Sequence, residues 1–427
     1  MKVLMMFPYA PLPPPHDLGG TKRNLPFLQE NLKRNEVSVL SYGTPEEERE
    51  FRQSFDHLCA DIRFVNRKRP RIVNGIEQLW LLATARSPFR QMYRGKMQRE
   101  LDELTSRTPF DVIHCCTQLL GYFRFPKGVP VVSDTHEVTY DLLYRTFKTT
   151  KDLIRKLLSY LSYRLGKRDE VDLCMKFDAV IAATERDYTV FRGELPHKKI
   201  FVIENGVGPA FFESQNVAPE PGALVFTGKM SYYPNIHGIV RFLDEIFPLI
   251  LLQAPHAKVY VVGAYPPQHL RRRASRNVIV TGFVEDVRPY IARGEVFLIP
   301  LWIGGGIRGK ALEAMAMRKP IVTTSIGCEG LNLAQGDSAL FGNTPTDFAA
   351  AVLRLLNDRA LRTRLAEKAY NHVTSRFNWS IQGKKLQGVY DNVIRERMAP
   401  QVFMFSTRKS AALSYEYNHP QKGAETS

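Results

Sequence analysis

The sequence lacks the features that mark several large classes of protein. No apolar run reaches the roughly 18 residues that a membrane-spanning helix needs, and the N-terminus enters a strand-like run without a signal-peptide pattern. The sequence has no Asp-x-Asp pair that would suggest a bound metal, and no Gly-x-Gly-x-x-Gly follows the first strand. We therefore expect no membrane span, no nicotinamide cofactor and no metal.

Cysteine is scarce, and the spacing of the five cysteines fits no metal site. An odd number also argues against a disulfide framework, so we expect reduced and buried thiols. The five residues are Cys59, Cys115, Cys116, Cys174 and Cys328. Together with the lack of a signal pattern, this predicts a cytoplasmic protein.

The composition is that of a globular protein with more than one domain. Hydrophobic residues make up 44% of the chain and charged residues 24%, and 427 residues are too many for a single core. The formal net charge is +16, which attracts anions such as nucleic acid or the inner leaflet of a membrane. Because no aromatic-interleaved nucleic-acid module accompanies the charge, we do not expect nucleic acid as a partner.

Many of the cations belong to a candidate amphipathic helix at residues 147–168. The leucines at helical spacing are Leu153, Leu157, Leu158, Leu161 and Leu165, and the cations between them are Lys151, Arg155, Lys156 and Arg164. Such a helix can lie on anionic lipid, where each basic side chain contributes about 1 kcal/mol. The alternative is a solvated helix whose leucines face the core of a domain. Both interpretations stay open at this point.

Strand-like and helical runs alternate along the chain, which indicates parallel α/β layers. The first half has strand-like runs at residues 2–7, 36–41, 111–114, 129–133, 179–183 and 199–203. The second half has them at 223–227, 258–262, 277–281, 295–299 and 321–324, with helical runs at 235–253, 346–356, 359–375 and 380–397. An Asn205-Gly206 turn, where a positive φ is tolerated, separates the halves.

The most informative stretch is residues 304–330, where a triple glycine runs into a helix and then into a short β-branched strand. Glycines let a ligand approach the backbone, and a helix N-terminus favours an anion. Arg308 and Lys310 oppose the helix dipole, which makes sense beside a multiply charged anion. Glu313 shares a face with Lys310, and its carboxylate suits a pair of sugar hydroxyls. The plain alternative is a glycine-rich loop with a surface salt bridge between Lys310 and Glu313.

This segment, with its Lys-Ala-Leu-Glu-Ala-Met-Ala helix, resembles the donor-binding signature of the retaining glycosyltransferases of family 4, which have the GT-B fold. The resemblance implies an α/β protein with two Rossmann-like, doubly wound parallel-sheet domains that face each other across a cleft. Residues 1–204 would form the acceptor-side domain and residues 205–378 the nucleotide-sugar domain. Residues 379–398 would form a helix that crosses back to the first domain, and residues 399–427 a flexible tail.

The resemblance also implies a donor site built from both domains. In the second domain the donor-binding residues would be Gly228, Lys229, Gly304, Gly305, Gly306, Ile307, Arg308, Lys310 and Glu313. In the first domain Gly19 and Gly20 would close over the diphosphate, and His136 would contact the transferred sugar. Catalysis would then depend on His136, on Lys229 as a phosphate clamp, and on Glu313 as the ribose contact. Asp134 and Glu137 are the next candidates for a polar role beside His136.

Two positions depart from the pattern of this family. Its Glu-x7-Glu motif would place the first glutamate at Gly305, which has no side chain to touch the sugar. A second lysine often follows the Gly-Lys pair, but here that region reads Tyr233-Pro234-Asn235. The second cation would then come from Arg308 or Lys310.

The resulting hypothesis is a hexosyltransferase-type glycosyltransferase that uses a nucleotide-diphosphate sugar and retains the anomeric configuration. The acceptor would be a glycan, a lipid-linked molecule or a small molecule, and neither a cofactor nor a metal would be needed. Three alternatives stay open: a GT-B sugar-nucleotide epimerase, a non-catalytic member that binds nucleotide, and a basic scaffold for membranes or nucleic acid. We expect a cytoplasmic protein, with peripheral contact at the inner face of the plasma membrane as an open alternative.

Overall fold

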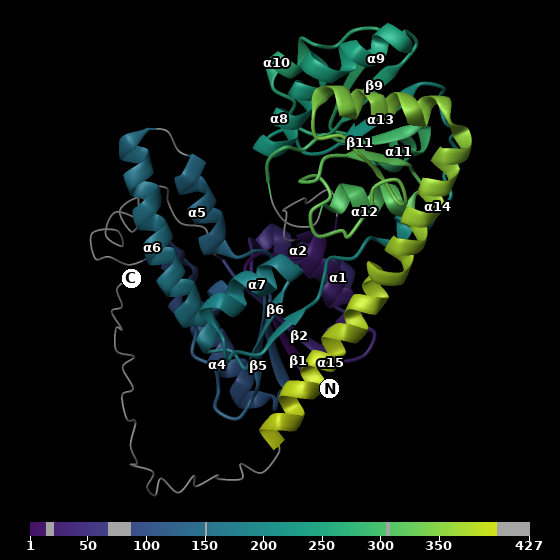
Figure 1. Cartoon of the computed structure of the whole chain (residues 1–427). Helices are drawn as coiled ribbons and strands as arrows, with labels where there is room; N and C mark the ends of the chain where they lie inside the picture. Colours follow the sequence, from purple (N-terminus) through teal and green to yellow (C-terminus); the bar gives the residue numbers. More distant parts are fainter. Residues whose placement is uncertain (14–20, 67–86, 150–151, 305–307, 399–427) are drawn as a thin grey trace, which may run out of the picture.

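The computed structural model describes residues 1–13, 21–66, 87–149, 152–304 and 308–398. It has two lobes, each built on a parallel sheet (Figure 1). The described strands follow the orders β3-β2-β1-β4-β5-β6-β7 and β10-β9-β8-β11-β12-β13. These two doubly wound sheets confirm the fold class that the sequence predicted. No helix in these ranges is long and apolar enough to span a bilayer.

The first sheet consists of short, buried strands, as expected for parallel strands covered on both faces. They are β1 (Lys2–Phe7), β2 (Glu36–Tyr42), β3 (Asp61–Val65), β4 (Val112–Cys115), β5 (Val131–Asp134), β6 (Ala179–Ala182) and β7 (Ile200–Val202). The helices are α1 (Thr21–Leu32), α2 (Pro45–Phe55), α4 (Gly95–Arg107), α5 (Thr139–Thr149), α6 (Leu153–Met175) and α7 (Glu185–Glu194). Strand β3 was not predicted, because two charged residues interrupt its apolar run at the edge of the sheet.

The second sheet follows the same plan. Its strands are β8 (Ala223–Thr227), β9 (Lys258–Val262), β10 (Val278–Gly282), β11 (Val296–Ile299), β12 (Ile321–Thr323) and β13 (Leu340–Phe341). The helices are α8 (Tyr233–Arg241), α9 (Phe247–Gln253), α10 (Gln268–Arg271), α11 (Arg288–Arg293), α12 (Gly309–Ala316), α13 (Pro345–Asn357) and α14 (Arg359–Arg376). The predicted single helix at 235–253 is wrong in one respect, since a π turn at Phe242–Ile246 joins α8 to α9. Pro248 lacks an amide hydrogen, so an interruption at this place is expected.

The last described helix, α15 (Trp379–Met398), lies along α1 of the first domain (Figure 1). Trp379, Val389 and Tyr390 are buried in the hydrophobic core that α1 shares with the first sheet. The Tyr390 hydroxyl lies 2.6 Å from Nδ1 of His114. Burial lowers the pKa of His114 to about 4, so this imidazole is neutral and Nδ1 can accept the hydroxyl proton. The exact domain limits, including the tail that lies outside the described residues, stay predictions.

The connection between the domains is extended, so the predicted Asn205-Gly206 turn is wrong. Gly206 does not adopt a positive φ. It is needed for close packing instead, because a Cβ atom there would lie 2.6 Å from Cδ2 and 2.9 Å from the backbone nitrogen of Trp379. A bridge between Val207 and Asn378 ties this connection to the start of α15.

The predicted helix at 147–168 is also wrong as a single element, since α5 ends at Thr149 and α6 begins at Leu153. Figure 1 shows the two helices projecting side by side from the first domain. The interpretation that the leucines face a core is wrong for four of them. Their exposed fractions are 82% for Leu153, 60% for Leu157, 52% for Leu158 and 45% for Leu161.

Gly206→Ala is expected to lower the free energy of unfolding by about 1–3 kcal/mol, because the new methyl group overpacks against Trp379. Urea denaturation followed by tryptophan fluorescence measures the change. The control is Gly388→Ala within α15, where a Cβ atom meets nothing within 4 Å and the substitution favours the helix. Equal effects of the two substitutions would show that the Gly206 contact does not matter.

Candidate functional site

The predicted site residues lie at the carboxyl ends of both sheets. The strand order reverses between β1 and β4 in the first sheet and between β8 and β11 in the second. Ligands of open α/β sheets bind beyond the carboxyl ends of the strands at such a reversal. Gly228 follows β8 directly, and Gly304 lies on the connection from β11 to α12. His136 lies two residues beyond the end of β5, which neighbours β4.

The side chain of Lys310 is the centre of the site in the second domain. Its Nζ donates a 2.8 Å hydrogen bond to Oδ1 of Asn235 and lies 4.1 Å from the ring centroid of Phe226. A Cβ atom at Gly228 would lie 2.7 Å from the same Nζ. Glycine is therefore required at 228 for the lysine to sit against the backbone.

The pKa of Lys310 is lowered to about 7, mainly by burial and also by the neighbouring cation Arg308. Lys22 acts in the same direction, whereas Glu313 opposes the shift. Near neutral pH the amine is thus divided between its charged and neutral forms. An anion placed beside it would restore the charge.

Arg308 immediately precedes α12, at the N-cap position but without a capping hydrogen bond from its side chain, and it is buried, with 7% of its surface exposed. Its guanidinium lies under the backbone at Gly304, where a Cβ atom would be 2.7 Å from Nη2. Gly304 also has a φ of 116°, which side-chain-bearing residues rarely adopt. The guanidinium therefore leaves no room for a side chain at residue 304.

Glu313 faces the first domain from the second turn of α12. Its Oε1 lies 3.4 Å from Nζ of Lys22, near the start of α1. The carboxylate side chain is 14% exposed and the lysine side chain 62% exposed. Glu313, the residue predicted to contact the ribose, is therefore paired with Lys22 of the first domain.

His136 is held by Asn24 of α1. Its Nε2 donates a 2.8 Å hydrogen bond to Oδ1 of Asn24. Burial lowers the pKa of His136 to about 4, although the Asp134 carboxylate opposes the shift. The imidazole is thus neutral, and with the proton on Nε2 its Nδ1 is an acceptor.

Arg23 joins α1 to β5 and to the connection between the domains. Its Nη2 lies 2.6 Å from Oδ1 of Asp134, and both side chains are buried, at 3% and 0% exposed. Nη1 donates to Oδ1 of Asn205 and Nη2 to the carbonyl of Ile203, both at 2.8 Å. Asp134, considered from sequence for a polar role beside His136, is thus engaged by Arg23.

Lys229 joins the Lys310 cluster through its backbone, because its carbonyl accepts a 2.9 Å hydrogen bond from the Asn235 amide, but its side chain points elsewhere. It is exposed, and its Nζ is 5.5 Å from the ring centroid of Tyr265. Its role as a phosphate clamp stays a prediction. The predicted contacts of Gly19, Gly20, Gly305, Gly306 and Ile307 lie outside the described residues.

Four residues of the site were not predicted from the sequence: Lys22, Arg23, Asn24 and Asn235. The first three follow the Gly19-Gly20 pair after Thr21, and their order Lys-Arg-Asn was the available signal. Asn235 occupies the region where a second lysine was sought, and it orients Lys310 instead of adding a charge. These are long-range partners, which local patterns do not identify.

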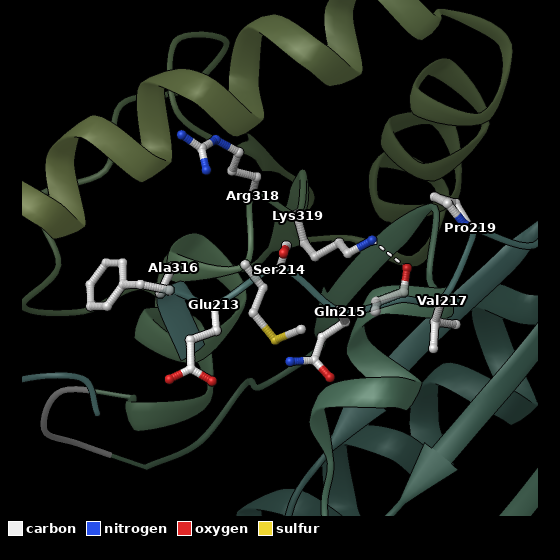
Figure 2. Close-up of a pocket in the computed structure, with 11 residues that line it drawn as sticks. Glu213, Ser214, Gln215, Val217, Pro219, Ala316, Arg318 and Lys319 are labelled. Atoms are coloured by element: carbon white, nitrogen blue, oxygen red, sulfur yellow. Dashed lines mark hydrogen bonds between the residues drawn. The ribbon is translucent and has the colours of Figure 1, made fainter. Parts of the chain in front are cut away.

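A separate hollow of about 230 Å³ lies at the other end of α12 (Figure 2). Lys319 lines it, and its Nζ donates to the carbonyls of Ala292 and Gly294 at 2.5 and 3.0 Å. Burial lowers the pKa of Lys319 to about 8. Because its ammonium group already donates hydrogen bonds to these two carbonyls, Lys319 stabilises the fold, and we assign no ligand to the hollow.

Comparison with known proteins places this site in a family. The model described as Glycosyltransferase Family 4 matches residues 18–211, and the model described as Glycosyl transferases group 1 matches residues 221–358. The chain is similar to the D-inositol 3-phosphate glycosyltransferase of Stackebrandtia nassauensis, with 38% identity over 376 residues. That alignment covers 78% of this chain and 82% of the relative.

Solved structures show the same fold at low sequence identity. The sucrose-phosphate synthase of Thermosynechococcus elongatus superposes with a TM-score of 0.65 at 16% identity, covering 92% of this chain and 99% of that chain. HepE of Anabaena, solved in complex with UDP, superposes with a TM-score of 0.64 at 14% identity, covering 92% and 100%. Taken with the two matched domains and the 38% identical relative, these likenesses show that the chain belongs to the family 4 glycosyltransferases of the GT-B fold.

Proposed function

We propose that this chain transfers a hexose from a nucleotide-diphosphate donor to a hydroxyl of a glycan, lipid-linked or small-molecule acceptor, with retention of configuration. The observation that carries the proposal is Lys310, a lysine of lowered pKa held against Gly228 at the strand-order reversal of the second sheet. A cation kept in this position without a carboxylate in direct contact suits an incoming phosphate.

The diphosphate would lie between Lys310 and the N-terminus of α12. As the bond to the sugar breaks, negative charge grows on the departing diphosphate. A cation and amides already in position stabilise that charge without reorganising, and a single such donor contributes on the order of 3 kcal/mol. Arg308, which is buried, would add to the positive potential there.

The ribose would lie against Glu313, one helical turn beyond Lys310. An ionised carboxylate accepts only, so it pairs with the two hydroxyl donors of a ribose. The base and ribose would thus be bound by the second domain, and the reacting sugar would face the first.

The transferred sugar would contact His136. Lys229 would contact the donor phosphate after its exposed side chain reorients. A neutral imidazole with a free Nδ1 can accept a hydrogen bond from a sugar hydroxyl without adding charge. The acceptor hydroxyl would attack from the face that the diphosphate leaves. The UDP complex of HepE, which shares the fold, supports a nucleotide donor.

Glu313→Ala is expected to weaken donor binding roughly 10- to 100-fold, because a hydrogen bond to a charged group contributes about 1.5–3 kcal/mol. A thermal-shift panel of nucleotide sugars identifies the donor, and titration calorimetry gives the affinities. The control is Glu367→Ala, which removes a half-exposed carboxylate from α14. Product analysis with and without acceptor then separates transfer from epimerisation, and unchanged affinity in Glu313→Ala would remove the ribose assignment.

Donor affinity is expected to fall as the pH rises above 7. The folded pKa of Lys310 is about 7, below the usual lysine value, so the free protein loses this charge through neutral pH while the bound anion favours it. Calorimetry with a nucleotide sugar between pH 6 and 8.5 tests this, because its diphosphate diester does not titrate there. Lys310→Met should bind weakly with little pH dependence, and an unchanged pH profile in that variant would contradict the assignment.

We also propose that the hairpin of α5 and α6 contacts an anionic membrane and so brings the enzyme to a lipid-linked acceptor. The exposed leucines lie along the first turns of α6, farthest from the sheet (Figure 1). Behind them, Arg164, Lys167 and Arg168 line a groove of about 330 Å³ together with Asp172 and Glu194, and Lys167 pairs with Glu194 at 2.7 Å. Apolar side chains ahead of Arg164 and Arg168 suit insertion between acyl chains with these two cations at the headgroups.

Leu153→Gln is expected to weaken binding to vesicles of phosphatidylglycerol and phosphatidylcholine roughly tenfold, since burial of a leucine side chain contributes about 1.5–3 kcal/mol. Co-sedimentation measures the partition. Leu252→Gln on α9 is the matched control, because Leu252 is 81% exposed and Leu153 is 82% exposed. Equal losses, or no binding of the unaltered protein, would rule out the membrane face.

A further inference from the structure

The two domains meet in an ion pair across the proposed donor site. Lys22 of α1 and Glu313 of α12 are 291 residues apart in sequence, and Nζ and Oε1 lie 3.4 Å apart. The carboxylate proposed to bind ribose therefore already has a cationic partner from the first domain.

The backbone of Lys22 is fixed, but its side chain can reorient. The next residue, Arg23, is buried and bonded to Asp134, which anchors the first turn of α1. The Lys22 side chain is 62% exposed and has four rotatable bonds, so it can reach more than one partner without movement of the helix. An exposed pair at 3.4 Å is also weak, on the order of 0–1 kcal/mol, so exchange costs little.

Both helix N-termini at this place carry lysine where acidic residues would be favourable. Within their described first turns, neither α1 nor α12 has an acidic residue. Lys22 is the second residue of α1 and Lys310 the second residue of α12. Each lysine opposes the positive end of its own helix dipole, which an anion between them would compensate.

The charges around Lys310 are not balanced. Of the charged groups among the described residues that shift its pKa, Arg308 and Lys22 are cations and Glu313 is the anion. Lys22 is therefore close enough for its charge to act on the ammonium group proposed to bind phosphate. An added anion at Lys310 would attract Lys22 as well.

We propose that Lys22 exchanges partners when the donor binds, moving from Glu313 to the donor diphosphate as the ribose hydroxyls take its place on the carboxylate. This inference rests on the proposed function and adds a specificity residue from the first domain. A ligand with ribose and diphosphate gains from the exchange, because Lys22 leaves one anion for another. A nucleoside has no phosphate to offer, so it must compete with Lys22 for Glu313.

The test compares Lys22→Met with the unaltered protein. Calorimetry measures the affinities for UDP, GDP and ADP and for uridine, guanosine and adenosine. The comparison then uses the nucleoside diphosphate that binds most tightly and the nucleoside with the same base. Lys22→Met is expected to weaken the nucleoside diphosphate roughly tenfold, as for loss of a charge-assisted hydrogen bond. The affinity for the matching nucleoside should stay the same or rise.

Lys33→Met is the matched control. Its side chain is likewise 62% exposed and pairs with Glu30, at the other end of α1. It should leave both affinities unchanged, and thermal midpoints should show that both variants are folded. Equal losses for diphosphate and nucleoside in Lys22→Met, or no loss for either, would overturn the inference while the proposed function stands. If the unaltered protein binds none of these diphosphates, the proposed function itself is rejected.

Discussion

The structure of the site depends on the buried pair of Arg23 and Asp134. Breaking a buried ion pair by removal of one partner costs about 3–5 kcal/mol, because the other charge is left without compensation. Here the guanidinium also holds Asn205 and the carbonyl of Ile203, on the connection between the domains. One side chain thereby sets the position of α1, the end of β5 and the start of the connection. His136 and Lys22, one beside Asp134 and the other beside Arg23, take their places from it.

The second domain uses burial differently. Lys310 is kept against Phe226 and Gly228 with an amide oxygen, not a carboxylate, as its hydrogen-bond acceptor. The free protein thus holds its cation at a cost in solvation, which a bound anion relieves. The buried ammonium group of Lys310 would then both bind the donor diphosphate and stabilise the negative charge that grows on it during transfer. Asn235, in the region where a second lysine was sought, orients the Lys310 ammonium group without adding a charge.

Much of the fold could be predicted because buried parallel strands are short apolar runs. The segment Ala223–Thr227 was predicted to the residue, whereas β3 was missed because charges interrupt it. The break between α5 and α6 was also missed, since the leucines that carried the prediction all lie within α6 and do not mark where that helix begins. In the site, the spacing of Lys310 and Glu313 was readable from the sequence. Arg23 and Asn235 were not, because each acts on a partner distant along the chain.

The return of α15 to the first domain has a mechanical consequence. The polypeptide passes between the lobes twice, near Glu204 and near Arg376, and an ion pair at 2.5 Å and the bridge of Val207 with Asn378 fasten these passages together. Two adjacent tethers restrict sliding and twisting of one lobe against the other. The register of the two lobes, in which Lys22 lies beside Glu313 of α12, is therefore fixed by contacts at the far side of the connection rather than by this weak pair alone.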